Sequence, residues 1–426
     1  MEYTRIIDRI KGGELDGIFC ELYGKENIMS QRVRYICAIE KFISLYGQRD
    51  ISIFSVSGRS ELSGNHTDHN RGCVIAASVN LDIIAVASST DGNIIKINSE
   101  DFGEETVDIE SYTCPDESLF GTSQSLIAGM CKGLSDAGYN VGGFVAYATS
   151  NVLKGSGLSS SAAFEDMIGN ILNHLYNGGK IDNVEIAKIS QTAENIFFGK
   201  PCGLMDQVAC AVGGIVAIDF KDTCAPDITP VNFDLTGAGY RLCIVNTGGN
   251  HADLTDEYSS IPTEMKAVAG ALGCEVLREL DESLVIESIP SLRKTVGDRA
   301  IMRALHFYEE NKRVKIQKQA LEAGDLSSFL ENVNSSGHSS FCYLQNVYTS
   351  KNLCEQGLSL ALCLCETVLD RKTSAWRVHG GGFAGTIQAY VRECDIDKFK
   401  TAMDKCFGDG SCIVLSVRRI GACKIC

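Results

Sequence analysis

Proline, tryptophan and long apolar runs are scarce in this sequence. It holds 6 prolines and 1 tryptophan, and no proline-rich stretch marks a linker between domains. No uninterrupted apolar segment reaches the ~18 residues that span a membrane. The first residues, MEYTRIIDRIKGGELDG, also lack the apolar core of an export signal. We therefore expect a cytoplasmic protein with no membrane partner.

Positive charge is scarce as well. Lys and Arg number 39 against 54 Asp and Glu, which gives a formal net charge of −15. The basic residues are scattered along the chain, whereas proteins that bind a nucleic-acid backbone gather them into a patch or stripe. This distribution argues against a nucleic-acid partner and favours a small-molecule substrate. It leaves the oligomeric state open.

The cysteines form no recognisable disulfide framework. There are 19 of them, an odd number without paired spacing, which fits reduced thiols in a cytoplasm. Cys423 and Cys426 form a C-x-x-C, but no second pair stands at zinc-finger spacing. We therefore expect no zinc site at this end of the chain.

The chain is long enough for two domains, because single cores stop growing near ~250–300 residues and this sequence has 426. Residues 144–148 are predicted to form a strand that leads into a glycine-rich turn at Lys154–Gly157. Apolar residues at helical spacing from Phe164 to Leu175 then predict a long helix. This strand, turn and helix is the strongest local pattern in the sequence.

Four further elements are predicted from spacing and capping residues. A second helix should start at Asp182 or Asn183 and end near Gly199. Toward the end of the chain, the pattern predicts a strand, a helix and a strand, which together form a β-α-β unit, at Thr386–Val391, Ile396–Phe407 and Cys412–Val417.

The segment Gly155–Ala162, GSGLSSSA, carries the clearest chemistry. Its glycines and serines stand where a helix begins, and the free N–H groups and positive dipole end there attract anions. The segment predicts a phosphate site, with a purely structural serine-rich helix cap as the alternative. A Walker A pattern is absent, and Gly380–Gly385 fits G-x-G-x-x-G but precedes a strand rather than a helix. Neither a P-loop nor a Rossmann fold is therefore predicted.

Three segments of the sequence, in this order, resemble the signatures of the galactokinases in the GHMP kinase superfamily. They are GRSELSGNHTDHNRG at Gly58–Gly72, GSGLSSSAAFE at Gly155–Glu165 and GGGFAG at Gly380–Gly385. Ala193–Gln207 and Asn246–Tyr258 are similar to two further galactokinase segments. The resemblance runs from about Phe42 to the end, so residues 1–41 look like an extension.

The resemblance implies an α+β, two-lobed GHMP kinase fold with mixed sheets and helices and an active site between the lobes. We expect the first lobe at residues 1–225 and the second at residues 226–426. It also implies an ATP-dependent kinase that uses Mg²⁺ and phosphorylates the anomeric C1 hydroxyl of a galactose-configured sugar. An inactive sensor that binds sugar and ATP is the alternative outside enzymes.

Site residues follow from the same resemblance. Asp206 is expected to face the anomeric hydroxyl, with Arg59 beside both it and the γ-phosphate, as the catalytic pair. Ser161 and Glu194 match the Mg²⁺ ligands of the family. The positions expected to contact the sugar are Asn65, His66, Asp68, Gly203 and Tyr258. Those expected to bind ATP are Gly155, Ser156, Gly157, Leu158, Ser159, Ser160 and Ser161.

Several positions depart from the galactokinase pattern. Asn65 replaces a glutamate that the family places near the C6 hydroxyl, and His69 replaces a tyrosine, as in galacturonate kinases of the superfamily. Because an amide can donate to a carboxylate, we expect a preference for a C6-altered sugar, galacturonate first, over galactose. We also expect Asn65→Glu to favour galactose. The alternative is that Asn65 bonds the neutral 6-hydroxyl, and N-acetylgalactosamine and arabinose remain conceivable acceptors. Further departures are Ser60, Glu61, Ile261 and Pro262.

Overall fold

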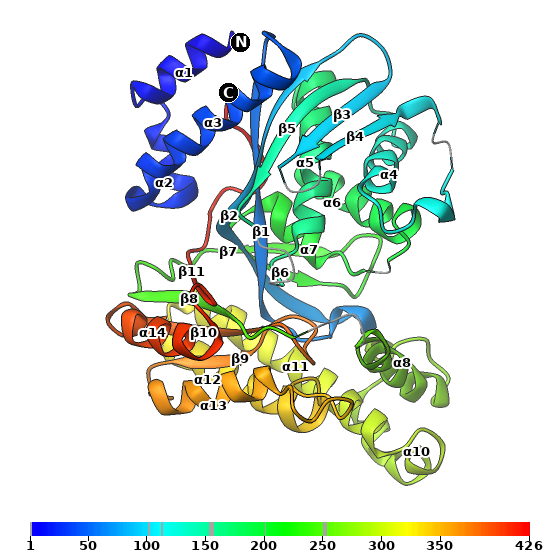
Figure 1. Ribbon diagram of the computed structural model, residues 1–426. Coiled ribbons are helices and arrows are strands. Elements are labelled where there is room, and N and C mark those ends of the chain that lie inside the picture. The colour runs from blue at the N-terminus through cyan, green and yellow to red at the C-terminus, as the bar shows by residue number, and fades with distance from the viewer. Residues whose placement is uncertain (1, 101–102, 112–113, 153–156, 201, 250–253) are drawn as a thin grey trace.

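The structure is a computed structural model that describes residues 2–426 apart from 101–102, 112–113, 153–156, 201 and 250–253. Two β-sheets organise the chain, one in each of two lobes stacked on one another (Figure 1). Helices cover both sheets, and the strands run in mixed directions. The predicted fold class, α+β in two lobes, is confirmed.

The first lobe is built on an eight-stranded sheet around the long strand β2 (Cys73–Ser89). One edge of β2 pairs with β1 (Ser52–Ser63). The other edge pairs first with β6 (Ile215–Asp219) and then with β5 (Phe144–Ser150), all antiparallel. The sheet is completed by β3 (Ile94–Ser99), β4 (Gly103–Asp108), β7 (Asp227–Val231) and β12 (Cys423–Lys424).

Helices cover the inner face of this sheet, on the right in Figure 1. They are α4 (Ser123–Asp136), α5 (Ser160–Tyr176), α6 (Asn183–Thr192) and α7 (Met205–Val212). The apolar stripe predicted on α5 is buried, with Met167, Ile168 and Ile171 each at most 1% exposed. They pack against residues that alternate along the strands, such as Ala85 and Ala87. Side-chain alternation therefore fixes which face of the sheet α5 covers.

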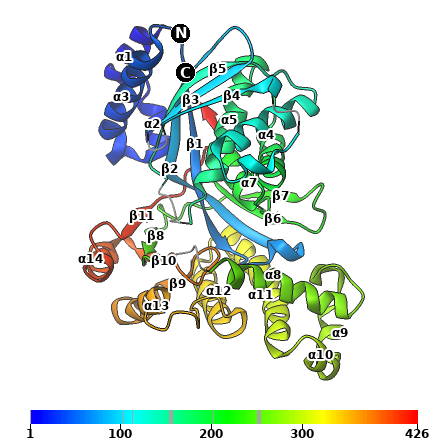
Figure 2. The ribbon, with the colours of Figure 1, turned by 45° about the vertical axis from the view of Figure 1, so that its right-hand side comes forward.

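The N-terminal residues form three helices that cover the opposite face of the sheet. These are α1 (Tyr3–Lys11), α2 (Asp16–Tyr23) and α3 (Ile28–Tyr46). Their apolar residues, among them Ile10, Phe19 and Phe42, form one buried cluster with Ile84 and Val86 of β2. Figures 1 and 2 show them beside the C-terminus of the chain. Residues 2–41 are thus a packed layer of the first lobe rather than a loose extension.

A buried polar network ties this layer to the sheet and to the last residues of the chain. Asp82 of β2 is 0% exposed and accepts hydrogen bonds from the guanidinium groups of Arg34 (2.6 Å) and Arg418 (3.1 Å). Tyr23 and Ser55 also donate to Asp82. Burial raises the pKa of Asp82, but the two arginines outweigh it, and the net shift is downward. The carboxylate therefore stays charged at neutral pH.

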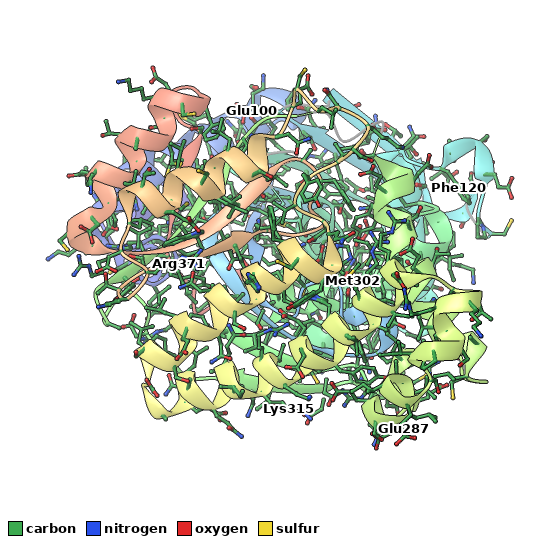
Figure 3. All side chains as sticks on the ribbon, turned by 90° about the horizontal axis from the view of Figure 1, so that it is seen from below. Glu100, Phe120, Glu287, Met302, Lys315 and Arg371 are labelled. Atoms are coloured by element: carbon green, nitrogen blue, oxygen red, sulfur yellow. The ribbon has the colours of Figure 1, made fainter. Side chains whose placement is uncertain are left out.

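The second lobe has a four-stranded sheet in the order β11-β8-β10-β9. Its strands are β8 (Tyr240–Asn246), β9 (Ala375–Val378), β10 (Thr386–Arg392) and β11 (Cys412–Leu415). The long helices α11 (Asp298–Ala323) and α12 (Leu326–Ser339) run along the underside, where Met302 and Lys315 mark α11 in Figure 3. The other principal helices are α8 (Thr255–Ala271), α9 (Glu282–Glu287), α10 (Ile289–Thr295), α13 (Gly357–Val368) and α14 (Ile396–Phe407).

The β-α-β unit predicted near the C-terminus is present as β10, α14 and β11. It is split, because β8 lies between the two strands and pairs antiparallel with both. The first lobe extends past residue 225, because β7 at Asp227–Val231 pairs with β6 of its sheet. It also includes β12 near the end of the chain, which pairs with β1. Among the helices of the described residues, none combines the length and the apolar character needed to cross a membrane.

Candidate active site

Arg59 and Asp206 form a two-point ion pair between β1 and the first turn of α7. Arg59 donates from Nε to Oδ1 and from Nη2 to Oδ2 of Asp206, each at 2.7 Å, and donates from Nη1 to the carbonyl of Gly157. Burial raises the pKa of Asp206, but the charge and hydrogen bonds of Arg59 outweigh it and lower the pKa below its ordinary value. The carboxylate is therefore ionised at neutral pH, and the guanidinium is held in one orientation.

Local backbone features aim this pair. The pairing of β1 with β2 shifts register between Ser57 and Arg59, which marks a bulge where Arg59 leaves the regular ladder. The Arg59 N–H donates to the carbonyl of Leu158 at 3.0 Å. A Cβ on Gly58 would lie 2.9 Å from that same oxygen, so only glycine permits the approach. Gly58 and Arg59 therefore bring β1 into contact with Gly157 and Leu158. These two residues belong to the predicted phosphate-binding segment Gly155–Ala162, called the phosphate loop below.

The described part of the phosphate loop leads directly into α5. Ser159 caps the helix in the left-handed region with φ of +56°, a sparsely populated conformation for a serine, and its Oγ donates to Oδ2 of Asp206. Helix α5 then begins at Ser160, and the N–H groups of its first turn face out of the N-terminal end of the helix. Gly155 and Ser156 lie outside the described residues. Gly157 and Leu158 lie beside Arg59 as stated above.

Ser161 and Glu194 are brought together as the sequence predicts. Ser161 Oγ donates to Oε1 of Glu194 at 3.2 Å, and Glu194 is 2% exposed in a π-helical turn, Ala193–Phe197, that follows α6. Gln207 Nε2 donates to Oε2 of Glu194 at 2.8 Å, and the largely exposed Lys200 reaches Oε1 at 3.0 Å. Hydroxyl and carboxylate oxygens suit Mg²⁺, so the donor set fits that ion.

A pocket of about 210 Å³ opens beside the start of α5. Its walls are mostly apolar, with Ser160 and Ser161 at the phosphate loop end and Glu100 and Thr149 among the polar groups. The full lining is Ile83, Ser99, Glu100, Gly121, Ser123, Leu126, Ala148, Thr149, Ser150, Val152, Ser160, Ser161, Phe164 and Phe198. A small, mostly apolar group attached to phosphates fits the volume and position of this pocket.

Three of the expected sugar-contacting residues lie on one loop and one helix facing each other. His66 has a left-handed φ of +62°, and its Nε2 donates to the carbonyl of Gly381 at 2.9 Å. The centre of its ring lies 5.2 Å from that of Tyr258 on α8, with the two rings tilted by 54°. Burial lowers the pKa of His66 to about 3, so the imidazole is neutral and Nε2 carries the hydrogen given to the carbonyl. A Cβ on Gly203 would lie 2.4 Å from Oδ2 of Asp68, so glycine there leaves room for that half-buried carboxylate.

Asn65 corrects one expectation, because its side chain is not available to a sugar. It is 0% exposed, and its Nδ2 donates to the carbonyl of Gly380 at 2.8 Å and to Oε1 of Glu61 at 3.3 Å. Its Oδ1 accepts from Asn346 at 2.8 Å and from Ser340 at 3.3 Å. Both amide hydrogens and both lone pairs are thus used inside the protein. In this arrangement Asn65 neither donates to a C6 carboxylate nor bonds a C6 hydroxyl, contrary to the expectation from the sequence.

The neighbouring departures from the galactokinase pattern belong to the same network. Glu61 forms a buried ion pair with Arg377 of β9 at 2.7 Å, and Ser60 lies 3.0 Å from Nε2 of His379. Both partners are in the second lobe, more than 300 residues along the chain. Ile261 instead lies in a separate apolar cluster, so its change is independent.

Sequence reasoning missed the residues that hold the site from behind. Four such residues, Arg377, His379, Glu310 and His306, are at most 2% exposed. Arg377 and His379 bond Glu61 and Ser60 at the end of β1, and Glu310 and His306 bond the backbone of the loop that follows it. For His306 and Glu310 the sequence does hold a signal, because a polar side chain stands at each position among apolar residues at helical spacing on α11. Among the described residues, no group of three or more His, Cys, Asp and Glu side chains is arranged to hold a metal ion.

Comparison with known proteins identifies the fold and the family. The model of the galactokinase galactose-binding signature matches residues 40–89, and that of the GHMP kinases N terminal domain matches residues 125–214. The galactokinase of Streptococcus suis is 31% identical over 376 residues, 86% of this chain and 92% of that protein. The galactokinase of Clostridium tetani is 30% identical over 85% of this chain and 89% of that protein.

Solved structures agree. The galactokinase of Lactococcus lactis, determined as a complex with galactose, superposes with a TM-score of 0.77 at 25% identity, over 92% of this chain and 99% of that one. A mevalonate kinase superposes with a TM-score of 0.61 at 15% identity, which shows the shared GHMP kinase fold alone. With two whole-length relatives at 30% identity or more, the chain belongs to the galactokinase family and is a sugar kinase.

Proposed function

We propose that this protein transfers the γ-phosphoryl group of ATP to the anomeric C1 hydroxyl of galactose, with Mg²⁺, in the cytoplasm. The observation that carries the proposal is the pair of Arg59 and Asp206, held at 2.7 Å between the phosphate loop and the loop of His66 and Asp68. The galactose assignment is supported by the galactose-binding signature at residues 40–89 and by the galactokinase relatives.

In this proposal Asp206 orients the hydroxyl and accepts its proton. Its lowered pKa makes it a weak base, which suffices because phosphoryl transfer has a loose transition state that asks little of the nucleophile before bond formation. Asp206 therefore acts mainly by position. Asp206 and the Gly157 carbonyl fix the guanidinium of Arg59, which places a positive charge beside the position that the γ-phosphate would occupy. This charge would offset the negative charge that develops on the phosphate oxygens.

ATP would bind with its base in the 210 Å³ pocket and its phosphates at the N-terminus of α5. The N–H groups of the first turn and the hydroxyls of Ser160 and Ser161 are the donors available there. Ser161 and Glu194 would hold Mg²⁺, and when bound the ion would neutralise phosphate charge. Lys200, whose side chain is 63% exposed, is free to move from Glu194 to a phosphate oxygen.

The sugar would lie between the loop of His66 and Asp68 and the ring of Tyr258. Asp68 is the half-buried carboxylate of the loop, and a carboxylate accepts two neighbouring hydroxyls of a sugar ring. Because the Asn65 amide is fully bonded within the protein, no described donor of that residue is left to favour a carboxylated sugar. We therefore place galactose before galacturonate, which reverses the order expected from the sequence.

The test is a comparison of acceptors with purified protein, ATP and Mg²⁺. Galactose, galacturonate, N-acetylgalactosamine and arabinose are assayed for ADP release, and phosphorus NMR identifies the product as an anomeric phosphate. We expect the highest kcat/KM for galactose. A higher value for galacturonate would reinstate the uronate reading, and calorimetric binding of sugar and nucleotide without any turnover would identify a sensor instead.

A further inference from the structure

Helix α11 of the second lobe holds a loop of the first lobe through a buried carboxylate. We call this loop, Gly64–Asp68, the sugar loop, because it carries His66 and Asp68. Glu310 is 0% exposed, and its Oε1 accepts hydrogen bonds from the backbone N–H groups of Gly64 at 3.3 Å and Asn65 at 3.4 Å. Ser336 of α12 donates to the same oxygen at 2.6 Å, and Arg313 Nε donates to Oε2 at 2.7 Å. An anion facing two consecutive N–H groups fixes the direction of that stretch of backbone.

His306, one turn earlier on α11, bonds the next peptide unit of the loop, on the other side of the same residue. Its Nε2 lies 3.1 Å from the carbonyl oxygen of Asn65, and its Nδ1 lies 2.8 Å from the hydroxyl of Ser339. A carbonyl only accepts, so Nε2 carries the hydrogen and Nδ1 accepts from the serine. Burial lowers the pKa of His306, so the neutral tautomer persists at neutral pH. Residue 65 is thus gripped at both its N–H and its C=O.

The loop needs such support because its backbone is held in uncommon conformations. Gly64 has a φ of +95°, and a Cβ there would lie 2.5 Å from the carbonyl oxygen of Cys73. His66 has a φ of +62°, although it is not glycine. Such conformations persist only when surrounding contacts impose them. The direction of the His66 ring and of Asp68, two residues later, depends on this stretch.

The charge on Glu310 is secure. Burial disfavours it, but the charges of Arg313 and Arg377 and the hydrogen bond from Ser336 oppose that effect, and the pKa of Glu310 lies below its ordinary value. The contacts of Glu310 with the loop are therefore present throughout the pH range in which a kinase is assayed. None of the atoms involved belongs to the phosphate loop or to the pair of Ser161 and Glu194.

We propose that Glu310 and His306 are positioning residues for the sugar: from the second lobe they fix the Gly64–His66 backbone so that His66 and Asp68 face the acceptor. This inference rests on the proposed function, since it assigns the loop to sugar binding. The proposal predicts an effect on sugar binding alone. Loss of either contact weakens sugar binding and leaves nucleotide binding unchanged, because ATP is held by α5 and its pocket.

The experiment compares Glu310→Gln with Glu309→Gln. The two changes are chemically identical and adjacent, but Glu309 is half-exposed on the outer face of α11, where it pairs with Lys312. The acceptor is whichever sugar the wild type phosphorylates best, so failure of galactose overturns the proposed function and not this inference. For Glu310→Gln we expect the KM for sugar to rise about tenfold, with the KM for ATP within twofold of wild type. Glu309→Gln should change neither.

A second pair of variants guards against misfolding of Glu310→Gln. His306→Leu removes the donor to Asn65, whereas His306→Gln supplies an amide donor at a similar reach. We expect His306→Leu to raise the sugar KM and His306→Gln to restore most of it, with circular dichroism and melting confirming folded protein. Equal rises in both KM values, a fall in kcat alone, or no difference between Leu and Gln at position 306 would each overturn the proposal.

Discussion

Replacing Asn65 with glutamate tests the account of the sugar loop quantitatively. The new carboxylate would stand where the Asn65 amide now lies 3.3 Å from Oε1 of Glu61 and 2.8 Å from the carbonyl of Gly380. Two unit charges at 3.3 Å repel by about 5 kcal/mol at an effective dielectric of 20. Protonating one carboxyl with an ordinary pKa of 4.5 costs about 3.4 kcal/mol at pH 7, at about 1.36 kcal/mol per pH unit. Protonation costs less than the repulsion between two charged carboxylates, so the pair of carboxyl groups takes up one proton.

The expected penalty is therefore about 3 kcal/mol at pH 7, and it depends on pH. Burial already raises the pKa of Glu61 despite the opposing charge of Arg377, and a second carboxylate raises it further. The folded variant then keeps a proton that the unfolded chain loses above about pH 4.5, so its stability falls as pH rises. At pH 5 the same proton costs about 0.7 kcal/mol. The deficit should nearly vanish there.

Asn65→Gln is the matched control, because glutamine has the length of glutamate without its charge. Urea unfolding of both variants at pH 5 and pH 7 gives the difference in unfolding free energy that the charge alone causes. We expect about 3 kcal/mol at pH 7 and under 1 kcal/mol at pH 5. Equal stability at pH 7, or a difference that does not change with pH, would refute the reasoning. The sequence-based expectation that Asn65→Glu restores galactose preference is thus replaced by an expected loss of stability.

Three further predictions concern the rest of the molecule. Asp206→Asn should lower kcat at least about 10³-fold while calorimetry still detects galactose and nucleotide binding, because a neutral amide cannot take the proton; wild-type turnover would remove Asp206 from the mechanism. Glu194→Gln should raise the Mg²⁺ concentration for half-maximal rate, with Ser161→Ala milder, and an unchanged Mg²⁺ titration would place the ion elsewhere. Asp82→Asn leaves Arg34 and Arg418 without their buried carboxylate, so the unfolding free energy should drop by about 3 kcal/mol with kcat unchanged, and an unaltered urea midpoint would contradict this.

Much of the fold was predictable because its signals are local. The apolar spacing of α5, the cap of α6 and the unit of β10, α14 and β11 each depend on residues within one or two turns. Asp182 does accept from the N–H of Val184 at 2.8 Å, as a capping residue should. The split of the β-α-β unit was hidden, since β8 comes from over 130 residues earlier in the chain.

The partners of Asn65 could not be predicted from local patterns. Apart from Glu61, four residues away, they are Gly380, Asn346 and Ser340 for its side chain and Glu310 and His306 for its backbone, all more than 240 residues away. A motif match gives the residue type that a family uses at a position but not the direction of a replaced side chain. The N-terminal helices are a different case. Ile6 and Ile10, then Tyr35, Ile39 and Phe42, repeat at helical spacing and are buried, so the pattern of a packed layer was present in the sequence.

The geometry of the Arg59 and Asp206 pair limits how the acceptor hydroxyl approaches. A carboxylate offers about four lone-pair directions. Among the described residues, Oδ2 of Asp206 accepts from both Arg59 and Ser159, whereas Oδ1 accepts from Arg59 alone. In the mechanism we propose, the unused direction on Oδ1 is the place for the sugar hydroxyl, and the fixed guanidinium sets where the γ-phosphate would lie relative to that oxygen. Since a loose transition state rewards alignment more than basicity, an ion pair that lowers the basicity of Asp206 while fixing its orientation favours the reaction.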